Sequence, residues 1–394
     1  MRHRYPSRRD FVQTSAGVVL GAAAAPLSPM RHGSRSAADK PVVSVVRIRN
    51  GRVDRAVEEA IDLLGGVETV AKGKDRVMLK PNLVAESPYF TTKPSVVRTL
   101  AALMQRSGKA VSIGEGSAAA NDFNVKGDTT YRTRNRELLD RMQRHVFDTL
   151  GYTELARSLQ VPLINLHSGE MAEVPLSNGF VFDTLTLHRS LTDTDLLCSI
   201  PMMKTHVLAT VTLGMKNLIG LYPGTVYYSV RAWLHDQAAM AESPGIAFET
   251  IDMVRASKLG LTVVDGSMAM EGDGPSGGTL VPMNLILAGM NPLATDIVAA
   301  DVMGFGMHEV PTFDWAYRAG LGPGKVGDIE VRGASLDDVR RSFVKPNVIP
   351  WQSINKAWGV QEIAHRRLLL RTEDCPAVPT ARCTVVRTCF RALR

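Results

Sequence analysis

Several residues with chemical potential follow one short apolar run. Residues 195–200 read as a buried strand, Pro201 closes it, and Lys204, His206, Lys216 and Asn217 come within the next seventeen positions. Ligands of open α/β sheets bind just beyond strand ends, and ammonium groups there favour carboxylates or phosphates. A histidine with a pKa near 6.5 can exchange a proton at neutral pH. The stretch predicts an anion site in which His206 is the catalytic acid or base and Lys204 a second catalytic residue.

The segment that carries Lys216 has the composition of a helix. Residues 207–221 are good helix formers interrupted by Gly214, and a spacing of four places Thr212, Lys216 and Gly220 on one face. Lys216 and Asn217 are therefore expected to bind the ligand or a cofactor in the same crevice. The alternative is that Lys204 and Lys216 are solvated surface lysines and that His206 is bonded to the backbone.

Two earlier predicted strands end in further candidates. Residues 76–79 lead into Lys80-Pro81-Asn82, and residues 110–113 lead into Gly114-Glu115-Gly116. Glycines in such a turn let the backbone approach a ligand closely. We therefore expect these segments to contribute to cofactor or ligand binding through Lys80, Asn82, Gly114, Glu115 and Gly116.

Three carboxylates follow a later apolar strand. Residues 261–264 end at Asp265, and Glu271 and Asp273 come next among glycines. Oxygen donors of this kind suit Mg²⁺, Mn²⁺ or Ca²⁺, so the three residues predict a divalent-cation site. Two alternatives stay open. Asp265 could serve as a catalytic acid or base, or the group could simply form turns.

An alternation of strands and helices would position all these residues. Apolar, β-branched runs and segments with helical spacing follow one another through most of the chain. The pattern predicts an α/β fold with an open, mainly parallel sheet flanked by helices, arranged as one elaborated unit or two lobes. A hairpin is expected within residues 173–187. The predicted strands are 42–48, 76–79, 110–113, 161–165, 195–200, 261–264, 285–288 and 329–332, and the main helices are 53–64, 94–104, 147–159, 292–303 and 312–319.

The first 38 residues have the features of an export signal. Arg8 and Arg9 form a twin-arginine pair, a mildly apolar run follows over residues 12–25, and small residues occupy positions 36–38. This order predicts export through the twin-arginine translocase to the periplasm or the extracellular space. The apolar run is too short for a stable transmembrane anchor, which needs roughly 20 strongly apolar residues.

The positive charge of the chain lies at its two ends. Six arginines against Asp10 give residues 1–38 a charge of +5, and seven arginines against two acids give residues 365–394 another +5. The chain as a whole carries +7, so the body between these ends is near −3. A nucleic-acid partner is not expected, because the body lacks a basic footprint. We divide the chain into the signal (1–38), an α/β domain (39–346) and a basic tail (347–394).

The four cysteines do not form a recognisable ligand set. Cys198 lies in an apolar run and is expected to be a buried small hydrophobe. Cys375, Cys383 and Cys389 lie in the basic tail, and their spacings match neither a ferredoxin run nor a zinc ribbon.

Taken in order, the motifs resemble the domain-of-unknown-function 362 family over roughly residues 42–333. The resemblance implies an α/β fold and, in many relatives, an attached ferredoxin-like module with iron–sulfur clusters. The ferredoxin-type cysteine run is absent from this sequence, which argues against such a cluster here. The matching residues are Lys80-Pro81-Asn82, Gly114-Glu115-Gly116, residues 201–206, Lys216-Asn217 with Gly220, Asp265-Gly266, residues 271–275, Asn291-Pro292 with Asp296 and Asp301, and residues 327–330.

Together these observations favour an exported enzyme that acts on a carboxylated or phosphorylated small molecule. Its reaction stays open between redox, metal-assisted, isomerisation and hydrolytic chemistry. The alternative is a non-catalytic protein that binds or delivers a metal or cofactor outside the cytoplasm. Turnover of the ligand would separate the two.

Overall fold

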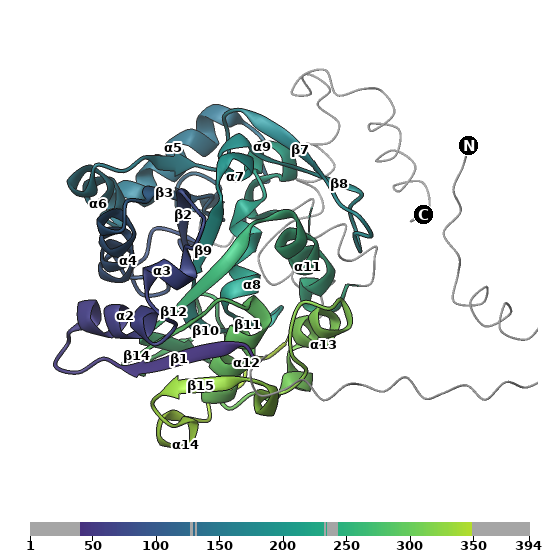
Figure 1. Ribbon diagram of the computed structural model, residues 1–394. Helices are drawn as coiled ribbons and strands as arrows, with labels where there is room; N and C mark the ends of the chain where they lie inside the picture. The colour runs from purple at the N-terminus through teal and green to yellow at the C-terminus, as the bar shows by residue number, and fades with distance from the viewer. Residues whose placement is uncertain (1–39, 127–128, 131, 232–233, 235–242, 349–394) are drawn as a thin grey trace, which may run out of the picture. The chain divides into compact units, whose positions relative to one another are not determined.

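The computed structural model describes residues 40–126, 129–130, 132–231, 234 and 243–348 (Figure 1). The predicted export signal lies outside these residues, as does the basic tail apart from its first two positions. In the described part of the chain, no helix is long and apolar enough to cross a membrane.

A sheet of eleven strands organises the described residues, and it confirms the predicted α/β class with a mainly parallel sheet. The path through it is β15-β1-β14-β12-β9-β2-β3-β6. From β12 to β6 every pair is parallel, whereas β14 runs antiparallel to both of its neighbours. The strands on this path are β1 (Val42–Arg47), β2 (Arg76–Pro81), β3 (Ala110–Glu115), β6 (Leu163–Asn165), β9 (Leu196–Ile200), β12 (Leu259–Glu271), β14 (Leu285–Gly289) and β15 (Glu330–Gly333).

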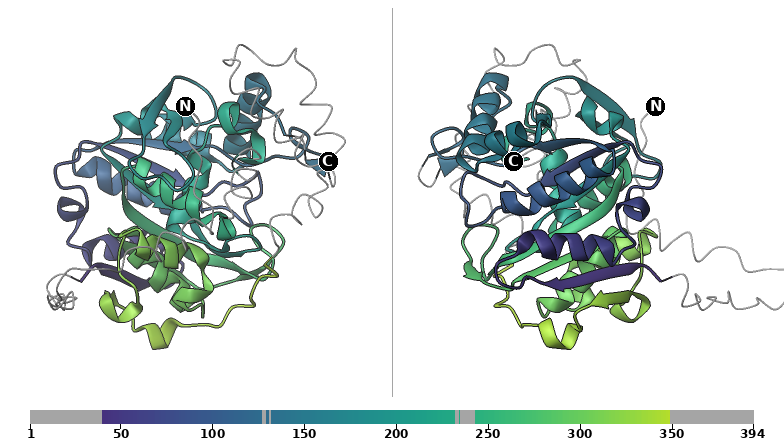
Figure 2. Two further views of the ribbon diagram at one scale, coloured as in Figure 1. Left: turned by 90° about the vertical axis from the view of Figure 1, so that its right-hand side faces the viewer. Right: turned by 60° about the vertical axis from the view of Figure 1, so that its left-hand side comes forward.

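Helices cover both faces of this sheet (Figures 1 and 2). Successive residues of a strand point to opposite faces, and β14 shows the result. Ile286 and Ala288 join one core with the helices α2 and α4, while Leu285 and Leu287 join a second core with α12. The longer helices are α2 (Val53–Asp62), α4 (Pro94–Arg106), α5 (Arg136–Thr149), α6 (Tyr152–Leu159), α11 (Ala247–Ala256), α12 (Pro292–Val302) and α13 (Pro311–Arg318).

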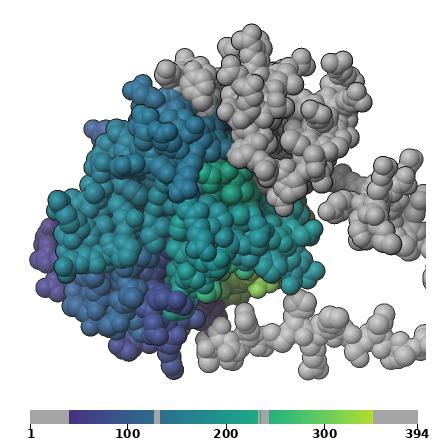
Figure 3. Space-filling model, turned by 90° about the horizontal axis from the view of Figure 1, so that it is seen from above, coloured from purple at the N-terminus to yellow at the C-terminus, as the bar shows by residue number. Residues whose placement is uncertain are grey.

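Shorter elements complete the described chain. The predicted hairpin is confirmed as β7 (Met171–Pro175) paired with β8 (Thr184–His188). The blue and teal middle of the chain forms most of the coloured surface in the view from above (Figure 3). The remaining elements are α3 (Val67–Val70), β4 (Val125–Lys126), β5 (Thr129–Thr130), α7 (Arg189–Asp193), α9 (Gly224–Tyr227), β13 (Thr279–Val281), α14 (Leu336–Val339) and the 3₁₀ turns η3 (Ser229–Arg231), η4 (Pro244–Ile246), η5 (Met307–Glu309) and η6 (Val326–Asp328).

The predicted helix over residues 207–221 is wrong. The chain instead forms β10 (Met202–His206) and turns at Thr210, which has a positive φ of 66°. It then returns as β11 (Thr210–Thr212) before a single helical turn, α8 (Gly214–Asn217), and the 3₁₀ helix η2 (Leu218–Leu221). β10 also pairs with β12, so sheet pairing and β-branched residues outweigh local helix propensity here.

Candidate functional site

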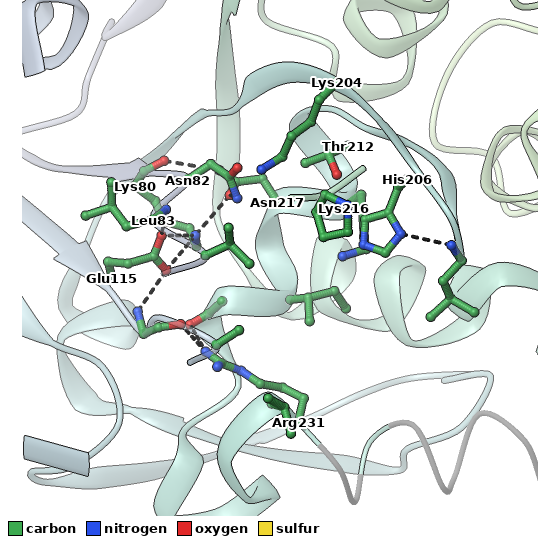
Figure 4. A pocket seen from close by; sticks show the side chains of 18 residues that line it. Lys80, Asn82, Leu83, Glu115, Lys204, His206, Thr212, Lys216, Asn217 and Arg231 are labelled. Carbon is green, nitrogen blue, oxygen red and sulfur yellow. Dashed lines mark hydrogen bonds and ion pairs between the residues drawn. The ribbon is translucent and has the colours of Figure 1, made fainter. Parts of the chain in front are cut away.

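A cavity of about 90 Å³ lies beside the carboxyl ends of β2 and β3, between the β10–β11 hairpin, α8 and η2 (Figure 4). This volume is several times the ~10–15 Å³ that one water molecule requires. Most of the residues that the sequence singled out line it, together with one that it did not. The polar lining residues are Lys80, Asn82, Glu115, Lys204, His206, Thr212, Lys216, Asn217 and Arg231.

A buried ion pair joins the ends of β2 and β3. The Lys80 ammonium lies 2.8 and 3.0 Å from the two carboxylate oxygens of Glu115, and both side chains are at most 2 % exposed. Glu115 also accepts the backbone N–H groups of Leu83 and Gly116 at 2.9 and 2.8 Å. Burial lowers the pKa of Lys80, and the attraction of Glu115 opposes that shift. The carboxylate is therefore saturated with donors and holds Lys80 in place.

Asn217 extends this network across the cavity. Its amide oxygen accepts from Lys80 Nζ and from Asn82 Nδ2, each at 3.1 Å. Its amide nitrogen donates to the Lys80 carbonyl and to Ser199 Oγ at 3.2 and 3.0 Å. Both ends of the Asn217 amide are engaged, whereas the side-chain amide oxygen Oδ1 of Asn82 is buried without a hydrogen-bond partner among the described residues.

Lys204 and Lys216 lie on the other side of the cavity in Figure 4. Lys204 is fully buried on β10 and donates to the Phe90 carbonyl at 2.6 Å. Burial, reinforced by the charge of Lys216, lowers the pKa of Lys204 well below its usual value. Burial followed by the charges of Arg231 and Lys80 lowers the pKa of Lys216 to about 7. Lys204 is fully buried and Lys216 is half-buried, so neither amine is a fully solvated surface lysine.

Arg231 is the residue that the sequence analysis missed. Its guanidinium donates to the carbonyls of Ser117, Gly116 and Gly220, and burial lowers its pKa to about 10. Tyr228, Val230 and Arg231 all have positive φ, a backbone conformation outside the right-handed α-helical region. The sequence did contain one indication of a buried arginine, because Arg231 lies within an apolar and aromatic run.

His206 is oriented by the backbone. Its Nδ1 accepts the N–H groups of Leu208 and Ala209 at 3.0 and 3.4 Å. A neutral imidazole that accepts at Nδ1 carries its proton on Nε2. His206 lies two residues from Lys204 on the same face of β10. This tautomer makes Nε2 a hydrogen-bond donor and not a proton acceptor.

Three glycines have different roles near the network. A Cβ on Gly220 would lie 2.4 Å from a Glu115 carboxylate oxygen and 2.6 Å from Lys80 Nζ, so only glycine fits there. A Cβ on Gly116 would lie 2.7 Å from the Gly220 carbonyl oxygen. Gly114, which we expected in the ligand site, instead packs against Met78 and Leu166 and is absent from the cavity lining.

The structure does not bring the three predicted metal ligands together. Asp265 and Glu271 lie in one continuous strand, β12, where six residues at about 3.3 Å each span on the order of 20 Å. Each of the three carboxylates has partners of its own. Asp265 accepts hydrogen bonds from the backbone N–H groups of Lys93 and Ser267. Glu271 accepts hydrogen bonds from the Arg341 side chain and the Val344 backbone N–H. Asp273 accepts hydrogen bonds from the backbone and the side chain of Asn347.

Asp265 is also absent from the cavity lining, so the structure gives no support to its predicted catalytic role. Among the residues that the structure describes, no group of three or more histidine, cysteine, aspartate or glutamate side chains is placed to hold a metal ion. Cys198 is buried and free, as predicted for a small apolar residue. The three tail cysteines lie outside the described residues.

The comparisons with known proteins place this chain in a family. Among curated proteins, "Thylakoid-associated protein sll1697" of Synechocystis sp. is 28% identical over 287 residues, which cover 71% of this chain and 80% of that protein. The lactate racemase apoprotein from Thermoanaerobacterium thermosaccharolyticum aligns with a TM-score of 0.41 at 12% identity and covers 67% of this chain and 57% of that one. A crystal structure of a Thermotoga maritima protein aligns with a TM-score of 0.31 at 14% identity over 55% and 50% of the two chains. The family model "Domain of unknown function (DUF362)" matches residues 77–301, more than half of the sequence, and the chain therefore belongs to the DUF362 family.

Proposed function

We propose that this protein is an enzyme whose cavity binds a small molecule carrying a carboxylate or a phosphate. The observation that carries the proposal is the charge of the cavity. Among the described residues that line it, Lys80, Lys204, Lys216 and Arg231 face a single carboxylate, Glu115. An excess of buried cationic side chains is costly without an anion, and a bound anion would relieve that cost.

The type of ligand follows from which cationic side chains already have a carboxylate partner. Glu115 neutralises Lys80, whereas among the described residues Lys204 and Arg231 are bonded to backbone carbonyls and neither is paired with a carboxylate. Burial lowers the pKa of both groups, and a bound anion would favour their charged forms. Hydrogen bonds from charged donors to an anion are about twice as strong as those between neutral groups. The small volume of the cavity favours a compact metabolite.

A non-catalytic binding protein is the second candidate, and one observation favours it. The one carboxylate of the cavity lining is saturated with donors, and the His206 Nδ1 atom is occupied by backbone N–H groups. Neither group is set up as a general base. If the bound molecule is recovered unchanged after prolonged incubation, the protein is a binder; conversion to a product establishes the enzyme.

Replacing Lys204 with methionine tests the anion site. We expect the affinity for sulfate and for acetate to weaken by about 1.5 to 3 kcal/mol, the range for hydrogen bonds to charged groups. The melting temperature should hold or rise, because the substitution removes a buried amine whose charge is disfavoured. Titration calorimetry and thermal melts measure the two effects.

Lys74→Met is the matched control, because Lys74 is exposed. It should leave anion affinity unchanged. Unaltered affinity in Lys204→Met together with a large drop in melting temperature would make Lys204 a structural residue and would contradict the site.

We also propose that the twin-arginine translocase exports the protein to the periplasm or beyond. The support is the order of the twin arginines, the weakly apolar run and the small residues in the sequence. Replacing both Arg8 and Arg9 with lysine should block export while the protein accumulates folded inside the cell. Cell fractionation with immunoblotting measures this. Unchanged export of the double variant would remove the proposal.

A further inference from the structure

One amine of the cavity differs from the other cations in having no partner among the residues that the structure describes. Lys80 is bonded to Glu115, Lys204 to the Phe90 carbonyl and Arg231 to three backbone carbonyls. The Lys216 ammonium has no hydrogen bond or ion pair within the described part of the chain, although it lines the same cavity. Nothing in the described fold requires a lysine at this position.

The surroundings of Lys216 favour its neutral form. Burial and the nearby charges of Arg231 and Lys80 lower its pKa to about 7, which raises the population of the free amine at neutral pH far above that of an exposed lysine. A desolvated lysine beside other cations is a typical amine nucleophile toward carbonyl carbon. Arginine could supply the same charge but not this reactivity, because its guanidinium stays protonated.

The remaining lining atoms fit a ligand with a carboxylate and a second polar group. Arg231 supplies positive charge for a carboxylate, and Lys204 supplies N–H donors whose protonated form a carboxylate would favour. The Thr212 hydroxyl oxygen and the Asn82 amide oxygen are buried without hydrogen-bond partners among the described residues, which is unusual for buried polar atoms. Thr212 lies directly opposite Lys204 in the β10–β11 pairing. These atoms can receive or orient the polar groups next to a carboxylate.

We propose that Lys216 forms an imine with a small 2-oxo acid held in this cavity. The inference rests on the proposed anion site and names its substrate class. The Nζ lone pair forms a bond to the ketone carbon, and the carbonyl electron pair moves to oxygen, which takes the proton that nitrogen releases. The resulting carbinolamine loses its hydroxyl as water after accepting a proton, and a protonated C=N bond remains. No oxidant or reductant is required.

Borohydride trapping tests the imine. The full chain is incubated with pyruvate and sodium borohydride, and its intact mass is measured. We expect an increase equal to the mass of pyruvate less one oxygen atom, with peptide mapping that places the adduct on Lys216. Acetate, which has no ketone, should give no adduct, and excess sulfate should suppress the adduct by competing for the cavity.

Lys216→Arg is the decisive variant, because it keeps the positive charge and removes the nucleophile. It should still bind sulfate but lose the adduct, whereas Lys74→Arg should keep it. If wild-type protein binds pyruvate and sulfate but gives no adduct, or if the adduct falls on Lys204 or on exposed lysines, the imine is overturned and the anion site stands. If no anion binds at all, both proposals fail.

Discussion

Replacing Glu115 with leucine is expected to lower the free energy of unfolding by about 3 to 5 kcal/mol, the range for removing one partner of a buried ion pair. The variant leaves the Lys80 ammonium buried at 1 % exposure without its counter-ion. It also deprives the Leu83 and Gly116 N–H groups of their acceptor. Urea denaturation followed by circular dichroism measures the loss.

Two further variants make this result specific. The double variant Lys80→Met, Glu115→Leu should recover part of the loss, because no unpaired charge remains, although the two N–H groups stay unsatisfied. Glu170→Ala removes an exposed ion pair with Arg189 and should cost only about 0 to 1 kcal/mol. A double variant as unstable as the single one would show that the backbone hydrogen bonds, and not the buried charge, account for the loss.

Anion affinity is expected to fall steeply as the pH rises above about 7. The Lys216 pKa is about 7, because burial and the charges of Arg231 and Lys80 disfavour its protonation. A bound anion favours the protonated form, so binding draws in a proton. The affinity should be flat below about pH 6 and should fall by close to tenfold per unit above about pH 8, since one pKa unit is about 1.36 kcal/mol.

The titratable groups near Lys216 either also weaken anion binding as the pH rises or are already paired with an opposite charge. Lys204 also has a lowered pKa, so its titration adds to the fall, while Glu115 is paired with Lys80. Calorimetry with sulfate in buffers of different ionisation enthalpy should show proton uptake near pH 8. Lys216→Met should bind more weakly at low pH and with a flatter profile. A wild-type profile that is flat over this range would contradict the inferred charge state.

The same pKa shift predicts how stability depends on pH. Lys216 is easier to protonate in the unfolded chain, where its pKa is near 10.5, than in the folded protein, where it is about 7. The unfolded state therefore binds more protons between these values, and stability contributed by this group rises with pH across that window. A lysine retained at such a cost to folding is typical of a functional residue.

The sequence predicted the main strands of the sheet and the β7–β8 hairpin, but not the β10–β11 hairpin. Short apolar runs located β2, β3, β9 and β14, because these strands are largely buried and their sequences are therefore mostly apolar. Residues 207–221 were misread as a helix because leucine and alanine favour helices locally. The deciding interaction, the pairing of β10 with β12, joins residues more than sixty positions apart and cannot be seen in a local window.

The candidate site was predictable where residues follow strand ends. Lys80, Asn82, Glu115, Gly116, Lys204, His206, Lys216 and Asn217 do line one cavity. The carboxylate site failed because β12 continues to Glu271, which separates Asp265 from the glycine-rich turn. Closeness in sequence implies closeness in space only where the chain turns. Arg231 escaped notice because its cavity contact depends on a positive-φ backbone that no residue pattern announced.

The position of β10 in the sheet has a consequence for how the proposed site would select a ligand. Lys204 and His206 lie on a strand paired with β11 on one side and β12 on the other, and Lys80 and Glu115 lie in the adjoining parallel strands β2 and β3. Such groups are preorganised, so a ligand loses little free energy in ordering them. We expect the strands to move by less than about 1 Å on binding, as in other rigid sites. Discrimination would then rest on the fit of a molecule to a fixed template, and an analogue one carbon too long would be rejected sterically instead of being accommodated.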